Sequence, residues 1–334
     1  MAFVKLNGQP VSFKASWYHA QNVGLSHNTV TGMSMDQNGF LWVGTIDGLN
    51  RFDGKGVKIY RHDATDSTSI SNSFIHGILA DDDGSLWIGT RDGGINKFDP
   101  VTESFQHFKY SEENKNSIPN APLNLFFKDN TGTYWASVGE ESYGVFDSQT
   151  GTYQKAEIRE VDTGRQVSSP NTVVMFNDGS MIGASFTGLF YVSAEEVKAF
   201  REDSQKEIIE TEQIDLSSFG ALPNLNRLLV DKTGNIWFSG DSEALLKVDK
   251  SALSESVNKS IESGTSIELS DKQFIESGDY LIYGAGDLGI CAKNILTDND
   301  FCQQIWVNGE LFSPTKLYKD PKGGIWAASW GKVL

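Results

Sequence analysis

The chain has 334 residues and a formal net charge of −16 at pH 7, from 28 Lys and Arg against 44 Asp and Glu. This balance excludes a nonspecific attraction to nucleic acid or to an anionic membrane surface, because phosphate contacts need clustered cations. No apolar run reaches the 18 or so residues of a membrane span, and 33 Gly with 11% aromatic residues are typical of a turn-rich globular β protein.

A short phrase recurs along the chain: an Asp, a Gly three residues later, then an apolar or aromatic residue and Trp. The five copies are Asp36 to Trp42, Asp81 to Trp87, Asp129 to Trp135, Asp231 to Trp237 and Asp320 to Trp326. The first three tryptophans are spaced by 45 and 48 residues, and the later gaps of 102 and 89 residues each leave room for one degenerate copy. Self-similarity of this period, with several strand-like runs per unit, indicates a β-propeller.

Both missing copies lie where the period predicts them. The segment 176–183 keeps the Asp-Gly turn and places Ile182 where Trp is expected. The segment 277–284 is looser, with Ile282 in the Trp position and one extra residue in the turn. The chain therefore contains seven units.

The first unit shows the four strands that each repeat is expected to form. Residues 30–35 alternate in character, as an inner strand does, and Asp36 to Gly39 has the chemistry of a tight hairpin turn. Residues 40–45 form a second strand in which Trp42 fills the space between adjacent blades. Residues 49–52 and 58–60 supply the third and fourth strands. Each blade is thus a four-stranded antiparallel sheet.

The ends of the chain suggest how the array closes. An alternating run at 10–18 precedes the first inner strand, and the chain stops after the third strand of the seventh unit, at 330–334. We therefore predict an all-β fold, with residues 1–334 as a single seven-bladed propeller whose ring is closed by the N-terminal strand joining the last blade as its outer edge. Both ends look like cut edges, so a longer parent protein is expected.

Two further features stand outside the repeat. The insert 194–218 contains apolar residues at helical spacing and predicts a short amphipathic helix, with a disordered acidic loop as the alternative. The two cysteines, Cys291 and Cys302, lie on consecutive strand-like runs joined by a turn. They either form a disulfide across that hairpin or remain two buried thiols.

The repeat resembles a known family. The segment 25–53, with Asp36-x-x-Gly39-Phe40-Leu41-Trp42-Val43-Gly44-Thr45 at its centre, closely resembles the two-component regulator propeller repeat, and so does the segment 70–95. Proteins that look like this are extracytoplasmic sensor parts of bacterial membrane receptors, whose output module is commonly a histidine kinase or a diguanylate cyclase. The resemblance implies a periplasmic, ligand-sensing domain that is not itself an enzyme.

The resemblance also suggests a carbohydrate breakdown product, or another small molecule, as the ligand. A homodimer formed through the parent receptor is the expected protein partner, with no nucleic acid and no direct membrane contact. Two other functions stay open: a protein-interaction or dimerisation scaffold, and a propeller lyase acting on a polysaccharide or an antibiotic. A lyase needs a metal or a histidine base near the channel.

Ligands of propellers usually bind over the channel, at the loops between second and third strands and between blades. Carboxylates, an arginine and aromatic rings in those loops suit a sugar. The candidate ligand-binding residues are Asp47, Arg91, Asp92, Glu141, Tyr143, Phe186, Asp241, Asp287 and Trp330. The alternative for the four aspartates is a plain turn role beside Gly, and for Tyr143 and Trp330 it is packing between blades.

No catalytic residues, metal ligands or cofactors are predicted. The five histidines are scattered over different strands and loops, with no two at metal-ligand spacing. The acidic run Asp81-Asp82-Asp83-Gly84 lacks the distant bidentate Glu of a calcium loop, so it is expected to be a hairpin turn.

Overall fold

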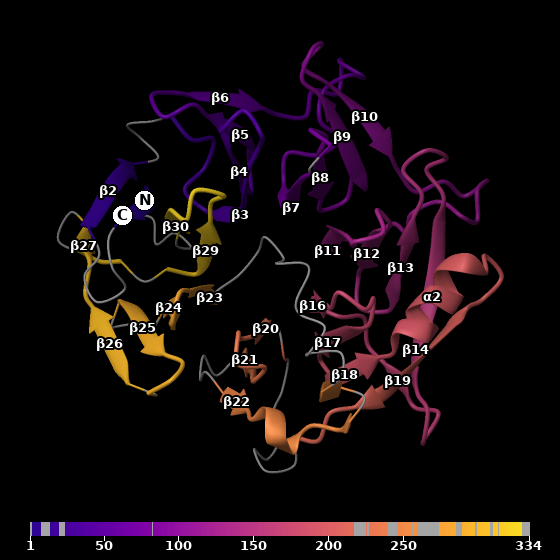
Figure 1. Cartoon of the computed structure of the whole chain (residues 1–334). Helices are drawn as coiled ribbons and strands as arrows, with labels where there is room; N and C mark the ends of the chain where they lie inside the picture. The colour runs from indigo at the N-terminus through magenta and orange to yellow at the C-terminus, as the bar shows by residue number, and fades with distance from the viewer. Residues whose placement is uncertain are drawn as a thin grey trace. The chain divides into compact units, whose positions relative to one another are not determined.

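The computed structural model describes residues 2–7, 14–19, 24–81, 83–216, 225, 227–239, 246–255, 257–258, 274–284, 289–297, 299–307, 310–312 and 314–328. The fold is all-β and consists mainly of antiparallel sheets (Figure 1). The chain divides into two compact units, one formed by residues 1–107 and 270–334 and the other by residues 108–269. Within the described residues no helix combines the length and the apolar character needed to cross a bilayer.

The first unit begins with two four-stranded sheets that follow the repeat. The first sheet has the strand order β3 (Val30–Met35), β4 (Leu41–Thr45), β5 (Gly48–Phe52) and β6 (Val57–Tyr60). The second sheet contains β7 (Ile75–Ala80), β8 (Leu86–Thr90), β9 (Ile95–Asp99) and β10 (Ser104–Phe108). The predicted four-stranded antiparallel blade is confirmed in both.

Two more sheets complete this unit. One has the order β23 (Phe274–Ser277), β24 (Tyr280–Gly284), β25 (Ile290–Asn294) and β26 (Asp300–Gln303), followed by a small hairpin of β27 (Trp306–Val307) and β28 (Glu310–Leu311). The other has the order β2 (Lys14–His19), β1 (Ala2–Asn7), β30 (Ile325–Ala328) and β29 (Lys316–Lys319). The two ends of the chain therefore share one sheet.

The way in which the ends meet differs in detail from the sequence prediction. The predicted N-terminal strand corresponds to β2, at the outer edge, but a strand that was not predicted, β1, lies between it and β30. β1 pairs antiparallel with β30, with Lys5 opposite Trp326. The N-terminal segment thus supplies two strands of this sheet. The C-terminal run 330–334, predicted as the third strand, lies outside the described residues.

The second unit holds one extended sheet and one small one. The extended sheet contains β11 (Leu123–Lys128), β12 (Tyr134–Val138), β13 (Ser142–Phe146), β14 (Tyr153–Glu160), β19 (Ile208–Gln213), β18 (Gly188–Val192), β17 (Met181–Ser185) and β16 (Thr172–Met175), with β15 (Gln166–Val167) paired to β14. The small sheet contains β20 (Arg227–Val230), β21 (Ile236–Ser239) and β22 (Leu246–Val248), and a 3-10 turn, η2 (Lys250–Ala252), follows it.

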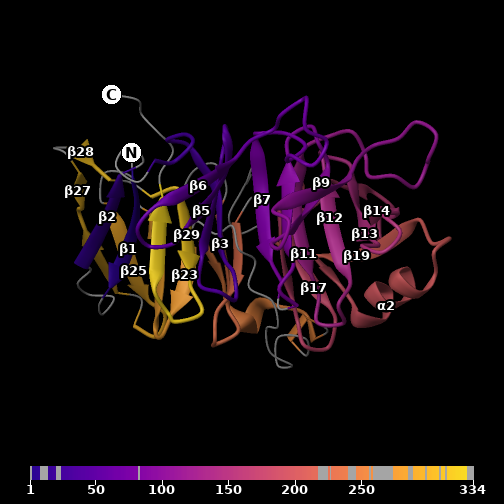
Figure 2. The same ribbon diagram turned by 90° about the horizontal axis from the view of Figure 1, so that it is seen from above.

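The extended sheet joins what the repeat pattern predicts as two blades. β14 and β19 pair in parallel, with Ile158 opposite Ile209. The helix α2 (Ala194–Glu202) precedes β19 and lies beside it in both views (Figures 1 and 2). The predicted amphipathic helix is confirmed: Ser193 caps it by accepting a hydrogen bond from the Glu196 N–H, and Val197 and Phe200 are buried.

The Asp-to-Trp phrase forms one repeated structural device. In four of the five copies, the aspartate follows the inner strand and its Oδ1 accepts backbone N–H groups of the turn. Its Oδ2 accepts the indole N–H of the tryptophan six residues later. The indole bonds are 2.8 Å for Trp42 to Asp36, 2.9 Å for Trp135 to Asp129, 2.6 Å for Trp237 to Asp231 and 3.0 Å for Trp326 to Asp320. The motif therefore fixes both the turn and the core side chain.

The degenerate units keep the same core position without the indole. Ile182 on β17 and Ile282 on β24 are both fully buried, as the predicted occupants of the Trp position should be. Their sheets form with regular antiparallel pairing. Burial of an apolar side chain at this position is therefore sufficient for the sheet, and the aspartate bond is an addition.

The structure joins Cys291 on β25 to Cys302 on β26 by a disulfide. The two residues lie directly opposite each other in the ladder, so the register brings the sulfur atoms within bonding reach. Of the two alternatives that the sequence left open, the structure contains the bonded one.

Candidate functional site

Two of the loops singled out from the sequence, β4–β5 and β8–β9, belong to the first and second sheets. β3 and β7 pack side by side: Ser34 Oγ accepts the Ala80 N–H at 3.3 Å, and a Cβ on Gly44 would lie only 2.7 Å from Cγ2 of Ile75. The β4–β5 and β8–β9 loops therefore sit at the same end of neighbouring sheets. We call this end, formed by residues 24–29, 46–48, 61–62, 70–76 and 91–94, the loop face.

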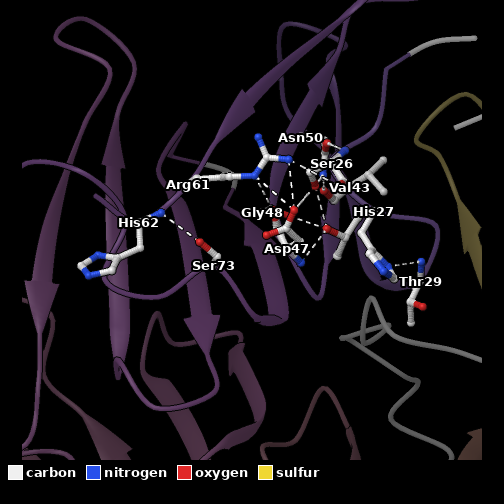
Figure 3. A network of polar contacts seen from close by, with 11 residues as sticks. Ser26, His27, Thr29, Val43, Asp47, Gly48, Asn50, Arg61, His62 and Ser73 are labelled. Carbon is white, nitrogen blue, oxygen red and sulfur yellow. Dashed lines mark hydrogen bonds and ion pairs between the residues drawn. The ribbon is translucent and has the colours of Figure 1, made fainter. Parts of the chain in front are cut away.

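A polar cluster supports the loop face from below (Figure 3). The buried Asn50 side chain accepts the Ser26 N–H at 2.7 Å and donates to the Val43 carbonyl at 2.9 Å. The hydroxyls of Ser26 and Thr45 are 2.7 Å apart, and Thr45 Oγ1 donates to the Gly48 carbonyl at 3.0 Å. Every polar group named is paired, so the cluster locks the connection between blades to the second and third strands of the sheet.

The second sheet repeats this cluster. Asn96, also fully buried, accepts the Ser71 N–H at 2.9 Å and donates to the Ile88 carbonyl at 3.3 Å. Ser71 Oγ lies 3.3 Å from Thr90 Oγ1 and donates to the Gly93 carbonyl at 2.9 Å. Sequence reasoning did not assign these asparagines. Their signal is an Asn at the same place in the third strand of both units.

In the third repeat, a tyrosine hydroxyl instead of an asparagine amide donates to the carbonyl of the second strand. Its β13 carries Gly144 opposite Ala136, where the first sheet pairs Asn50 with Val43. A Cβ at Gly144 would lie 2.0 Å from the Gln154 carbonyl oxygen. The Tyr153 hydroxyl, on β14, is 3.2 Å from the Ala136 carbonyl and so supplies its hydrogen bond.

Asp47, in the β4–β5 loop, forms an ion pair with Arg61. Its Oδ2 lies 3.1 Å from Arg61 Nη2 and 3.3 Å from Arg61 Nε, and the Asp47 carbonyl accepts from Nε at 3.0 Å (Figure 3). Both side chains remain about half exposed. Arg61, which follows the fourth strand, was not predicted as part of this region. Its presence makes Asp47 half of a surface ion pair.

Arg91, in the β8–β9 loop, is exposed and lies over an aromatic ring. Its guanidinium carbon is 5.2 Å from the centroid of Phe74, and the His76 ring stacks against Phe74 at 5.3 Å. The backbone N–H of Arg91 donates to the Phe74 carbonyl at 3.0 Å. Asp92 is exposed beside it. Phe74, just before the inner strand, was missed by sequence reasoning.

The other predicted residues fall in the second unit or outside the described part. Glu141 and Phe186 are exposed loop residues, Phe186 by 41%. Tyr143 requires a correction. It lies on β13 rather than in a loop, is fully buried, stacks on Trp135 at 5.3 Å and donates to Met181 Sδ at 3.4 Å. Burial also raises its pKa well above the usual value. Asp241, Asp287 and Trp330 lie outside the described residues.

The histidines whose side chains are described mostly serve local structure. His27 Nδ1 accepts the Thr29 N–H at 2.9 Å (Figure 3). Ring nitrogens of His62 and His107 lie 2.9 and 2.7 Å from the carbonyls of Ile70 and Ser69. In the described part of the chain, no group of three or more His, Cys, Asp and Glu side chains is arranged to hold a metal ion.

Two hollows on the first two sheets lie at the end opposite the loop face. One cavity of about 200 Å³ is lined by the Asp36 turn with Phe40, Arg51 and Phe98, and a shallower one of about 510 Å³ runs past Phe98 and Pro100. Asp83 and Gly84 of the acidic run border them. In the described part of this run the Gly84 N–H donates to the Asp81 carbonyl at 3.0 Å, as in the hairpin turn that the sequence predicts.

Among known proteins, the similarities include the first two repeats. The sequence profile described as "two component regulator propeller" matches residues 24–47 and 69–92, which contain the Ser, Asp, Trp and Thr positions of the first two repeats. Over 48 residues the chain is 58% identical to histidine kinase P4 of Formosa agariphila, a stretch that covers 14% of this chain and 4% of that protein.

Solved structures share the fold. The extracellular domain of the hybrid two component system BT3049 from B. thetaiotaomicron is similar with a TM-score of 0.68 and 20% identity, over 92% of this chain and 39% of that one. The corresponding domain of BT4673 from the same organism gives 0.64 and 19%, over 93% of this chain and 42% of that one. This chain thus spans less than half of each. On an all-β framework of mainly antiparallel sheets, two segments of the chain match the two-component regulator propeller repeat.

Proposed function

We propose that this chain is the ligand-sensing, extracytoplasmic propeller of a bacterial signal-transduction receptor, located in the periplasm. The observation that carries the proposal is the match of residues 24–47 and 69–92 to the regulator propeller repeat. The 48 residues shared with a histidine kinase and the fold likeness to extracellular domains of hybrid two component systems support it. The parent receptor would carry the output module.

The proposal includes a closed ring of seven blades. Support comes from the recurrence of the Asp-to-Trp phrase at the predicted period and from the pairing of β1 with β30, which joins the first and last segments in one sheet. A ring sealed in this way leaves few exposed strand edges, a common means by which β proteins avoid aggregation.

The ligand surface that we propose is the loop face of the first compact unit. Asp47, Arg91 and Asp92 supply it, and in the second compact unit, taken by itself, Glu141 and Phe186 are the candidate ligand contacts. The expected ligand is an oligosaccharide or another small polar molecule, because carboxylates and guanidinium groups pair with hydroxyls and aromatic rings pack against sugar faces. Tyr143 is left out because it is buried.

A thermal-shift screen against oligosaccharides and short peptides tests the sensing proposal. A ligand that binds the folded chain raises its Tm by mass action, in a concentration-dependent manner. We expect at least one saturable hit. A chain that no small molecule stabilises, but that forms a dimer at increasing concentration in sedimentation velocity, would instead support the scaffold function and contradict ligand sensing.

A further inference from the structure

We infer that Arg91, placed over Phe74, is the carboxylate-binding element of the loop face and that the chain binds a hydroxylated carboxylic acid, such as a sugar acid. This inference rests on the proposed sensing function and specifies the class of ligand. Among the arginines whose side chains are described, Arg91 differs from the others because it forms no ion pair with a described carboxylate, although the chain is strongly acidic.

The other arginines with described side chains each have a carboxylate partner. Arg51 pairs with Glu103 and Arg61 with Asp47, at 3.3 and 3.1 Å. The remaining pairs are Arg159 with Glu157 at 2.8 Å, Arg165 with Glu160 at 2.5 Å and Arg201 with Asp129 at 3.1 Å. Arg91 has no such partner among the described residues, although Asp92 is its neighbour in the chain. Its charge is therefore left to solvent or to a ligand.

The position of Arg91 is nonetheless well defined. The Phe74 N–H donates to Asn72 Oδ1 at 2.7 Å, and the Phe74 carbonyl accepts the Arg91 N–H at 3.0 Å. The guanidinium lies over the Phe74 ring, which His76 supports from stacking distance. A cation held on a ring keeps its N–H groups available for a planar, bidentate acceptor, and ordering it in advance lowers the entropy cost of binding.

The surrounding groups define the rest of the ligand. Asp92 is exposed, and Asp47, half exposed, keeps its contact with Arg61. Carboxylates accept hydrogen bonds and repel bare anions. A ligand that offers one carboxylate to Arg91 and hydroxyl groups to Asp92 satisfies both demands, whereas a simple inorganic anion satisfies only the first.

NMR of the full chain, labelled with ¹⁵N, tests the inference with glucuronate and glucose as probes, since the two differ only at the carboxylate carbon. We expect glucuronate to shift the Asp92 backbone amide and the Arg91 Nε–H signal saturably, and glucose to leave both in place. The Arg91 side-chain signal is identified by its loss in Arg91→Lys. Inorganic sulfate is the third probe. Saturation by sulfate at lower concentration than by glucuronate would overturn the assignment to a hydroxylated acid.

Three variants distinguish a loss of ligand binding from a loss of stability. Arg91→Gln should weaken glucuronate binding, followed at the Asp92 amide, by about tenfold or more, equivalent to about 1.4 kcal/mol, with an unchanged Tm because the side chain is exposed. Phe74→Leu should weaken it less. Arg165→Gln removes the same charge from an arginine that is already paired and should leave binding unchanged.

Two results would overturn the inference: a glucuronate titration that moves neither signal, or binding that survives Arg91→Gln. These are distinct from failure of the sensing proposal. If a neutral oligosaccharide stabilises the chain and Arg91→Gln has no effect on that shift, sensing stands and the carboxylate site is wrong.

Discussion

Asp129 illustrates why an aspartate begins the turn in five of the repeats. Its side chain is fully buried, yet Oδ2 accepts the Trp135 indole N–H at 2.9 Å and Arg201 Nη1 lies 3.1 Å away. Oδ1 accepts the Thr131 hydroxyl and the backbone N–H of Thr133. Burial by itself would raise the pKa of Asp129, but the hydrogen bonds from Thr131, Trp135 and the backbone outweigh it, so the pKa is lowered.

The first prediction concerns this charge. Asp129→Asn should lower the free energy of unfolding by about 2 kcal/mol at neutral pH, because charge-assisted hydrogen bonds to the indole and Arg201 are lost. Since the folded-state pKa lies below that of the unfolded chain, the stabilisation is present above about pH 4 and is lost as the pH falls through the folded-state pKa. Urea unfolding at several pH values measures both effects.

Asp162→Asn is the matched control, since Asp162 is exposed. It should leave stability and its pH dependence nearly unchanged. An Asp129→Asn variant with the same acid sensitivity as the parent chain would contradict the prediction.

At the residue scale, the sequence predicted the parts that follow from local chemistry. The Asp-Gly turns and the buried tryptophans come from short-range patterns, so they were found. Tyr143 was misplaced because β13 begins at Ser142, and strand ends are set by pairing with neighbours that the sequence does not display. Asn50 was missed because a buried amide in an alternating strand looks like any outward-facing polar residue until its partners are known.

At the scale of elements, Glu103 links the first two sheets. It lies in the β9–β10 turn with φ of 55°, and its carboxylate reaches Arg51 at 3.3 Å, Lys58, and the Tyr60 hydroxyl at 3.2 Å. The hydrogen bond from Lys58 is the main reason why the pKa of Glu103 is lowered. One turn of the second sheet thus contacts two strands of the first.

The second prediction separates the two properties of Glu103. Glu103→Ala loses the contacts and keeps a left-handed backbone that Ala resists, whereas Glu103→Gly loses the contacts but relieves that strain. Both variants should melt below the parent chain, and the Ala variant should melt lowest. Thermal unfolding followed by circular dichroism gives the order. An Ala variant as stable as the Gly variant would show that the turn is unstrained.

The third prediction concerns the disulfide between β25 and β26. Alkylation without reductant should leave Cys291 and Cys302 unmodified, and alkylation after reduction under denaturing conditions should label both, as seen by mass spectrometry. Because the bond closes a short loop of the unfolded chain, its reduction should cost about 2–3 kcal/mol of stability. The Cys291→Ser/Cys302→Ser double variant is the control and should not respond to reductant. Labelling of the unreduced protein under denaturing conditions would contradict the bond.

At the scale of the whole molecule, the sheet that unites the chain ends is the most consequential feature. β1 pairs with one edge of β30, and β29 pairs with its other edge. The sequence indicated that the ends meet, because the repeat started and stopped out of phase. It missed β1, although the Asn-Gly pair at residues 7 and 8 is a hairpin signal, because only the pairing with β30 defines residues 2–7 as a strand of this sheet.

The fourth prediction tests this sheet. Deletion of residues 1–19 should lower the Tm and promote aggregation, because the edge of β30 becomes available to other chains. A synthetic peptide of residues 1–19, added in excess, should restore part of the Tm, whereas a scrambled peptide should not. Light scattering and thermal unfolding follow the two effects. A truncated chain as stable and soluble as the parent would contradict the role of β1.

The parallel pairing of β14 with β19 could not be foreseen from any local pattern, because β19 reaches β14 only after the detour through α2. It has a practical consequence for anyone who would recombine the repeats. Main-chain hydrogen bonds between β14 and β19 join the third sequence repeat to the fourth, so cutting between these repeats would split a sheet through its interior. A chimera or a shortened version of this protein must transplant or remove the third and fourth repeats as one piece.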